Sequence, residues 1–172
     1  MNDEAPQILR RIRILIAFVI FGIVISGVTA FPLVYEVDIL HAWTSASPLP
    51  QPIKDWVAKV HEGLHATAEA YPFLHYGTDW LAFGHIVIAL FFVAPFMDPA
   101  RNVSVIRLGQ IACVLVIPTA LICGQIRGIP LWWRAIDCAF GVFGFLPLWY
   151  ADRLIRQLER TNQVAARAPA LK

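Results

Sequence analysis

Four long runs of apolar residues constrain this chain more than any other feature of its sequence. Each run contains at most one Asp, Glu, Lys or Arg, and the four occupy residues 12–34, 80–97, 104–126 and 135–151. An α-helix rises about 1.5 Å per residue, so roughly 20 residues cross a hydrocarbon layer of about 30 Å. The sequence therefore predicts an all-α, polytopic membrane protein, built as a bundle of four transmembrane helices.

The overall composition agrees with this class. The chain is 58% hydrophobic and 15% charged, whereas soluble domains are about 45–50% apolar and about 25% charged. The apolar residues come in blocks without a wet face, so we expect one membrane domain over residues 1–172, with the lipid bilayer as a partner. A formal net charge of +2, without a basic region studded with aromatic residues, argues against nucleic acid as a partner.

The first run admits a second interpretation, because arginines precede it and Val28-Thr29-Ala30 resembles a signal-peptidase site. A secretory signal peptide has an apolar region of about 7–15 residues. The run here is longer, and further apolar runs follow it. These features favour a transmembrane helix over a cleaved signal peptide.

The longest polar segment, residues 35–79, separates the first two runs. Alternating prolines within residues 43–52 predict an extended loop, because proline lacks the N–H that a helix needs. From about residue 53 to residue 71 apolar residues recur at spacings of three and four, which is typical of an amphipathic helix. This helix carries too many charges to span a bilayer, so we expect it to lie on the membrane surface.

Positive charges indicate which side of the membrane this segment occupies. Ten Lys and Arg residues lie on the side of the two termini, and four lie on the other side. By the positive-inside rule both termini, including a tail at 152–172, are cytoplasmic. Residues 35–79 then form an extracytoplasmic loop that carries the amphipathic helix.

The clearest motif of this loop is the pentapeptide HEGLH at residues 61–65, which matches the HExxH pattern of zinc hydrolases. Two histidines four residues apart, His61 and His65, lie on one helical face and can hold Zn²⁺, while Glu62 would polarise a bound water as a general base. A third ligand is needed, and the chain offers His75, Glu69, Asp79 and His85. Of these, His75 completes the candidate metal set.

The motif departs from zinc peptidases at two flanking positions. Lys59 and Thr67 stand where those enzymes place an uncharged and an apolar residue. Three fixed positions in five also match by chance, and histidines are common in helices at a membrane interface. We therefore expect no cofactor, with zinc as the alternative and Glu62 as the catalytic residue of that alternative.

A second group of polar residues marks the extracytoplasmic ends of the second, third and fourth spans. Ionisable groups at membrane depth are costly and by default indicate function. We expect these residues to converge on a polar, outward-facing mouth: Asp79, His85, Arg127, Arg134 and Asp137. The structural interpretation is an ion-pair network that closes the bundle, with Arg134 paired to Asp137 and Arg127 paired to Asp79, and the functional alternative is a pocket that binds a small ligand.

The three cysteines lie in or near the third and fourth spans, so the chain has no framework of a secreted disulfide protein. They are typical of small packing residues. A bridge between Cys123 and Cys138 across the last helical hairpin stays open as an alternative.

Residues 71–85 read YPFLHYGTDWLAFGH, and residues 127–144 read RGIPLWWRAIDCAFGVFG. These segments resemble an uncharacterised family of small bacterial membrane proteins. The resemblance covers roughly residues 71–146 and implies a multi-pass protein with four spans in the bacterial inner (plasma) membrane. It implies no activity, because the family has none assigned, and HEGLH lies outside the matching segments.

Three hypotheses for the function follow. The preferred one is a non-enzymatic accessory or envelope-associated factor, whose partner is another membrane protein or a second copy of this chain. The second is a zinc-dependent membrane hydrolase that uses HEGLH. The third is a carrier or sensor that binds a small ligand or lipid.

Overall fold

The computed structural model describes residues 4–167, which form seven α-helices and one short 3₁₀-helix, with no strand among them. Four segments are long and apolar enough to cross a membrane: Glu4–Ala30, Pro72–Met97, Val103–Ile126 and Leu131–Gln163. These segments confirm the predicted class, an all-α integral membrane protein with four spanning helices.

The four spanning segments contain six of the eight helical elements. They are α1 (Glu4–Ala30), η1 (Pro72–Leu74), α4 (His75–Phe91), α5 (Val93–Met97), α6 (Val103–Ile126) and α7 (Leu131–Arg167). α1 begins before the predicted first span 12–34 and ends at Ala30, four residues before its predicted end, while α4 begins at His75, inside the predicted loop 35–79. α7 continues beyond residue 151, so most of the predicted tail at 152–172 is helical. Residues 168–172 of that tail, with Lys172, lie outside the described residues.

The second span is divided by a proline. Pro95 has no N–H to bond to the carbonyl of Phe91, and α4 ends at Phe91 before α5 begins at Val93. The chain turns tightly between them, since the N–H of Phe92 donates to the carbonyl oxygen of Ala89 at 3.1 Å. Pro118 and Pro147, by contrast, lie inside α6 and α7 without ending either helix.

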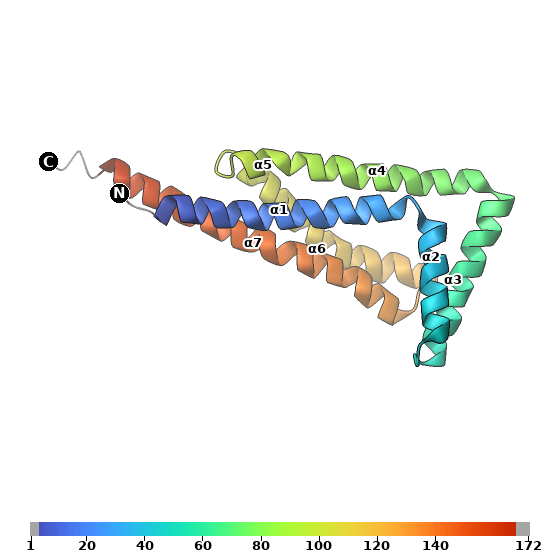
Figure 1. The fold of residues 1–172 in the computed structure, drawn as a ribbon. Helices are drawn as coiled ribbons and strands as arrows, with labels where there is room; N and C mark the ends of the chain where they lie inside the picture. Colours follow the sequence, from blue (N-terminus) through green and yellow to red (C-terminus); the bar gives the residue numbers. More distant parts are fainter. Residues whose placement is uncertain (1–3, 168–172) are drawn as a thin grey trace. The chain divides into compact units, whose positions relative to one another are not determined.

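The chain divides into two compact units, which we describe separately. The first comprises residues 1–21 and 89–172. In this unit α6 and α7 run side by side (Figure 1). α1 buries side chains at the spacing of one helical face, namely Ile8, Ile12, Ile16 and Val19.

Small residues let α6 and α7 approach closely. A Cβ atom added at Gly141 of α7 would lie 2.6 Å from the backbone carbonyl oxygen of Cys113 on α6. At Gly144 it would lie 2.9 Å from the Sγ atom of Cys113. Such small residues are typical of interfaces between transmembrane helices, where van der Waals contact between close backbones holds the pair together.

One acidic side chain is buried in this unit. Asp152 of α7 is 4% exposed, and a buried carboxylate requires a partner to offset the loss of hydration. Arg107 of α6 lies 3.2 Å from its Oδ1 atom, and Arg156, one turn later in α7, pairs with its Oδ2 atom. The contact with Arg107 connects the two helices on the side where the sequence predicts the cytoplasm.

The second unit comprises residues 22–88 and contains a helical hairpin. α2 (Leu33–Ala46) and α3 (Gln51–Ala70) pack side by side with a short connection between them (Figure 1). The helix predicted at 53–71 is therefore present as α3. The extended loop predicted at 43–52 is wrong at both ends, because α2 runs up to Ala46 and α3 already begins at Gln51, with Pro52 in its first turn.

Substitution of Gly141 by alanine tests the close approach of α6 and α7. Because its Cβ would meet a backbone atom that cannot swing away, we expect Gly141→Ala to lower the free energy of unfolding by about 1–3 kcal/mol. Unfolding of the detergent-solubilised protein in sodium dodecyl sulfate measures this free energy.

Gly22→Ala is the matched control, since a Cβ at Gly22 meets nothing within 4 Å. It should be neutral or stabilising, because alanine favours the helix over glycine by about 1 kcal/mol. Equal stability of the two variants would contradict the predicted clash.

Candidate functional site

The hairpin of α2 and α3 positions the candidate site through a small buried seam. Val37 and Thr44, two turns apart on α2, are buried, as is Val57 on α3. Asp38 follows Val37 directly, and His61 lies one turn after Val57. The polar side chains that border these buried residues, Asp38 on α2 and His61 on α3, therefore meet at the edge of the seam.

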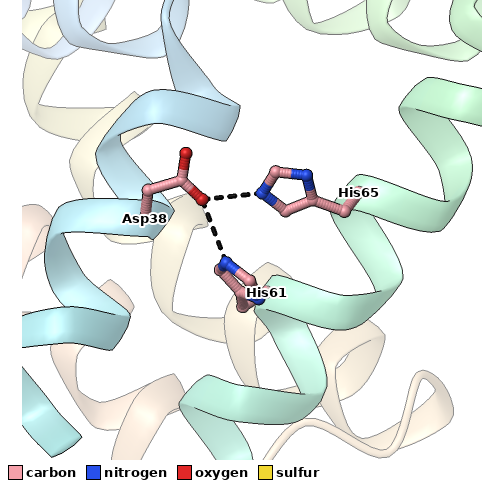
Figure 2. Close-up of side chains that lie close together, drawn as sticks. All are labelled: Asp38, His61 and His65. Atoms are coloured by element: carbon pink, nitrogen blue, oxygen red, sulfur yellow. Dashed lines mark hydrogen bonds and ion pairs between the residues drawn. The ribbon is translucent and has the colours of Figure 1, made fainter.

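Three of these side chains converge on one point (Figure 2). The Nε2 atom of His65 lies 2.6 Å from the Oδ1 atom of Asp38, at hydrogen-bond distance. The Nε2 atom of His61 lies 3.0 Å from the same oxygen. The two histidines come from α3 and the carboxylate from α2, so the cluster joins the two arms of the hairpin. We call Asp38, His61 and His65 the hairpin cluster.

The hairpin cluster is open to solvent and electrostatically coupled. The side chains of His61, Asp38 and His65 are 29%, 43% and 46% exposed. The hydrogen bond from His65 is the main cause that lowers the pKa of Asp38 below its ordinary value, and His61 lowers it further. The carboxylate is therefore held in its ionised form, which is the form that accepts a hydrogen bond or binds a metal ion.

The hairpin cluster has the donor set and spacing of a metal site. Its two imidazole nitrogens and one carboxylate oxygen all lie within 4.8 Å of one another. Zinc binds such atoms at about 2.0–2.2 Å, which separates neighbouring ligand atoms of a tetrahedron by about 3.3 Å. The two imidazole nitrogens lie 2.6 and 3.0 Å from the carboxylate oxygen, so these two separations would lengthen when an ion binds between the side chains.

Two further side chains border the hairpin cluster. The ring of His41, one turn after Asp38 on α2, stacks on the ring of His61 with 4.4 Å between centroids and an interplanar angle of 29°. Glu62, the glutamate of the HExxH motif, is exposed next to His61.

His75, which completed the metal set expected from the sequence, is not in the hairpin cluster. It lies at the start of α4, and its Nε2 atom is buried without a hydrogen-bond partner among the described residues. With Asp79, one turn later, it lines a groove of about 320 Å³ against the residues between α1 and α2.

His85, expected at the floor of a polar mouth, is held by its own helix. Its Nδ1 atom lies 2.8 Å from the carbonyl oxygen of Leu81 and donates to it. A Cβ at Gly27 of α1 would lie 2.9 Å from the Cβ atom of His85, so the two helices approach closely there. His85 thus occupies a packed position of the second unit.

Three residues of the expected mouth, Arg127, Arg134 and Asp137, belong to the first unit. Arg127 and Asp137 line one groove of about 570 Å³ along α6 and α7. The side chain of Arg134 covers Gly124, and its Nη1 atom donates to the carbonyl oxygen of Leu121 at 3.1 Å. Among the described residues Arg134 forms no ion pair with Asp137. Asp79 and His85 lie in the other unit, and their convergence with this group stays a prediction.

The cysteines are free. Cys113, Cys123 and Cys138 form no disulfide, so the alternative bridge between Cys123 and Cys138 is not present. The Sγ atom of Cys138 faces the carbonyl oxygen of Ile117 at 4.0 Å, in the packing of α6 and α7.

Asp38 is the site residue that the sequence analysis missed. Its segment was treated as part of a polar loop, although Val37, His41 and Thr44 recur at the spacing of a helical face. That periodicity predicts a helix, but the residues of α3 that Asp38 meets depend on how the two helices pack.

Comparison with family models, with curated proteins and with solved structures finds no match to this chain. The function is therefore inferred from the geometry of the fold and of the hairpin cluster.

The pKa of Asp38 tests the hairpin cluster directly. In metal-free buffer we expect it to lie below 3.8, and His65→Ala should raise it toward that value, because the hydrogen bond from His65 is its main cause. Since the folded-state pKa is lowered, the contribution of this carboxylate to stability is present above the ordinary pKa and is lost as pH falls through the lowered one. Carboxyl ¹³C NMR, with Asp38→Asn to assign the resonance, measures the pKa.

His61→Ala should raise the pKa of Asp38 by less than His65→Ala does, and His75→Ala should leave it unchanged. If His65→Ala leaves the pKa where it was, the contact between Asp38 and His65 is not formed in solution.

Proposed function

We propose that this integral membrane protein is a non-enzymatic accessory factor or sensor that binds a divalent transition-metal ion on its extracytoplasmic helical hairpin. The observation that carries the proposal is the convergence of Asp38, His61 and His65 from two different helices. Binding there would clamp α2 to α3 and thus couple the ion to the fold of the hairpin.

The distribution of charge supports an extracytoplasmic position for the hairpin. Most Lys and Arg residues flank the spanning helices on the side of the termini, which the positive-inside rule assigns to the cytoplasm. The bacterial inner membrane, which the resemblance of residues 71–146 implies, is part of the proposal. Exposure of the hairpin cluster gives ions, or a partner membrane protein, access from outside.

The donor set selects the class of ion. Imidazole nitrogen suits Zn²⁺, Cu²⁺ and Ni²⁺, whereas Ca²⁺ and Mg²⁺ need six or more oxygen ligands or retained waters. Two imidazoles with one carboxylate therefore favour zinc and its neighbours in the first transition row. We take Zn²⁺ as the reference ion.

A zinc-dependent hydrolase is the second candidate, and one observation favours it. Asp38 supplies the third ligand that the HEGLH motif lacked, and three protein ligands with an open fourth position are the pattern of catalytic zinc sites. Glu62 would then act as the general base on the bound water. A water at the open position, activated by Glu62, would distinguish this candidate from the first.

Metal binding by the full-length protein in detergent tests the proposal. After treatment with chelator and its removal, we expect calorimetric titration to give one Zn²⁺ per chain and no binding of Ca²⁺ or Mg²⁺. His61→Ala combined with His65→Ala should weaken Zn²⁺ binding by more than about 100-fold. Loss of a residue that only supports a ligand already weakens metal binding by about 10–100-fold, and this variant loses two ligands.

His75→Ala is the matched control, since it removes an imidazole of the same unit that lies outside the hairpin cluster. It should bind Zn²⁺ as the unchanged protein does. Binding that survives the double substitution would place the metal elsewhere and contradict the proposal.

A cysteine introduced at Ser47, between α2 and α3, tests the topology. With the natural cysteines replaced by alanine, Ser47→Cys should react with a membrane-impermeant maleimide added outside intact cells, and Glu4→Cys should react only after the membrane is opened. Labelling of the Ser47→Cys variant only from the cytoplasmic side would overturn the extracytoplasmic assignment.

A further inference from the structure

We infer that His41 is the fourth ligand of the hairpin site, so that a bound zinc-class ion has four protein ligands and no open position. The inference rests on the proposed metal binding. It assigns a role to a residue that belongs to neither the HExxH motif nor the hairpin cluster.

The helical spacings bring His41 to the right place. Asp38 and His41 are three residues apart on α2, so they share a face and lie about 4.5 Å apart along the axis. His61 and His65 are four residues apart on α3 and also share a face. Each helix therefore offers two ligands to the seam, in a two-plus-two arrangement across the hairpin.

The ring of His41 contacts its neighbours by stacking alone. It stacks on the ring of His61, and the hydrogen bond from the hydroxyl of Thr44, at 3.1 Å, goes to the backbone carbonyl oxygen of His41. Its ring nitrogens have no hydrogen-bond partner among the described residues. A His41 nitrogen would reach the ion by rotation about its two side-chain bonds, and no hydrogen bond of the ring to a described residue opposes that rotation.

Four protein ligands change what the site can do. Closed tetrahedral sites hold zinc for structure or signalling, whereas catalytic sites keep one position for water. With His41 bound, Glu62 has no metal-bound water to activate. The fourth ligand thus separates the accessory or sensor function from the hydrolase.

His41→Phe tests this role, because phenylalanine keeps a ring that stacks on His61 but has no nitrogen to bind metal. In full-length protein loaded with Co²⁺, we expect the unchanged protein to show the intense visible absorption of a four-coordinate ion. His41→Phe and His41→Ala should both weaken Co²⁺ binding about 10-fold or more and shift the absorption toward that of a site with bound water. His75→Ala should match the unchanged protein in both measurements.

The outcomes separate this inference from the proposed function. If both His41 variants bind Co²⁺ with unchanged affinity and spectrum, His41 is not a ligand, although the three-ligand site stands. If His41→Ala weakens binding while His41→Phe behaves as the unchanged protein, His41 acts only by stacking, and the inference is overturned. If the unchanged protein binds no Co²⁺, the inference and the proposed function both fail.

Discussion

A peptide group inside a hydrocarbon layer finds no water to bond to, so each N–H and C=O must be satisfied within its own helix or by a neighbouring one. This requirement forces the four apolar runs into helices and leaves their apolar side chains free to face lipid. Because lipid is as apolar as those side chains, close packing at small residues has to hold helices together. Gly141 against Cys113, and Gly124 beneath Arg134, are two of the places where small residues let α6 and α7 pack closely.

The same requirement explains which parts of the fold could be predicted from the sequence. Runs of about 20 apolar residues leave only a helix available, and all four predicted spans are present as helices. Outside the membrane water satisfies the backbone, so sequence patterns decide less strongly. Pro48 and Pro50 lie in the connection between α2 and α3, but Pro52 lies in the first turn of α3, where a missing N–H costs nothing. The alternating prolines therefore predict a longer loop than the one that is present.

The candidate site was predictable only in part for a related reason. His61 and His65 are four residues apart, and a spacing within one helix is visible in the sequence. Asp38 reaches them through the packing of α2 on α3, and the register of that packing depends on Val37, Thr44 and Val57 filling one seam. His75, at the start of α4, was a reasonable third ligand by residue type, yet it lies in a different contact region of the same unit.

The position of the hairpin cluster bears on the choice between binding and catalysis. Metal-assisted hydrolysis benefits from a site that excludes water, since charge stabilisation is stronger where the dielectric constant is low. The hairpin cluster is instead at the edge of a two-helix seam, with Asp38 and His65 each more than two-fifths exposed. Asp38 already joins α2 to α3 through its hydrogen bond with His65, so an ion bound there would tighten an existing contact between the two helices. This coupling of an ion to the packing of the hairpin suits the proposed accessory or sensor role better than it suits catalysis.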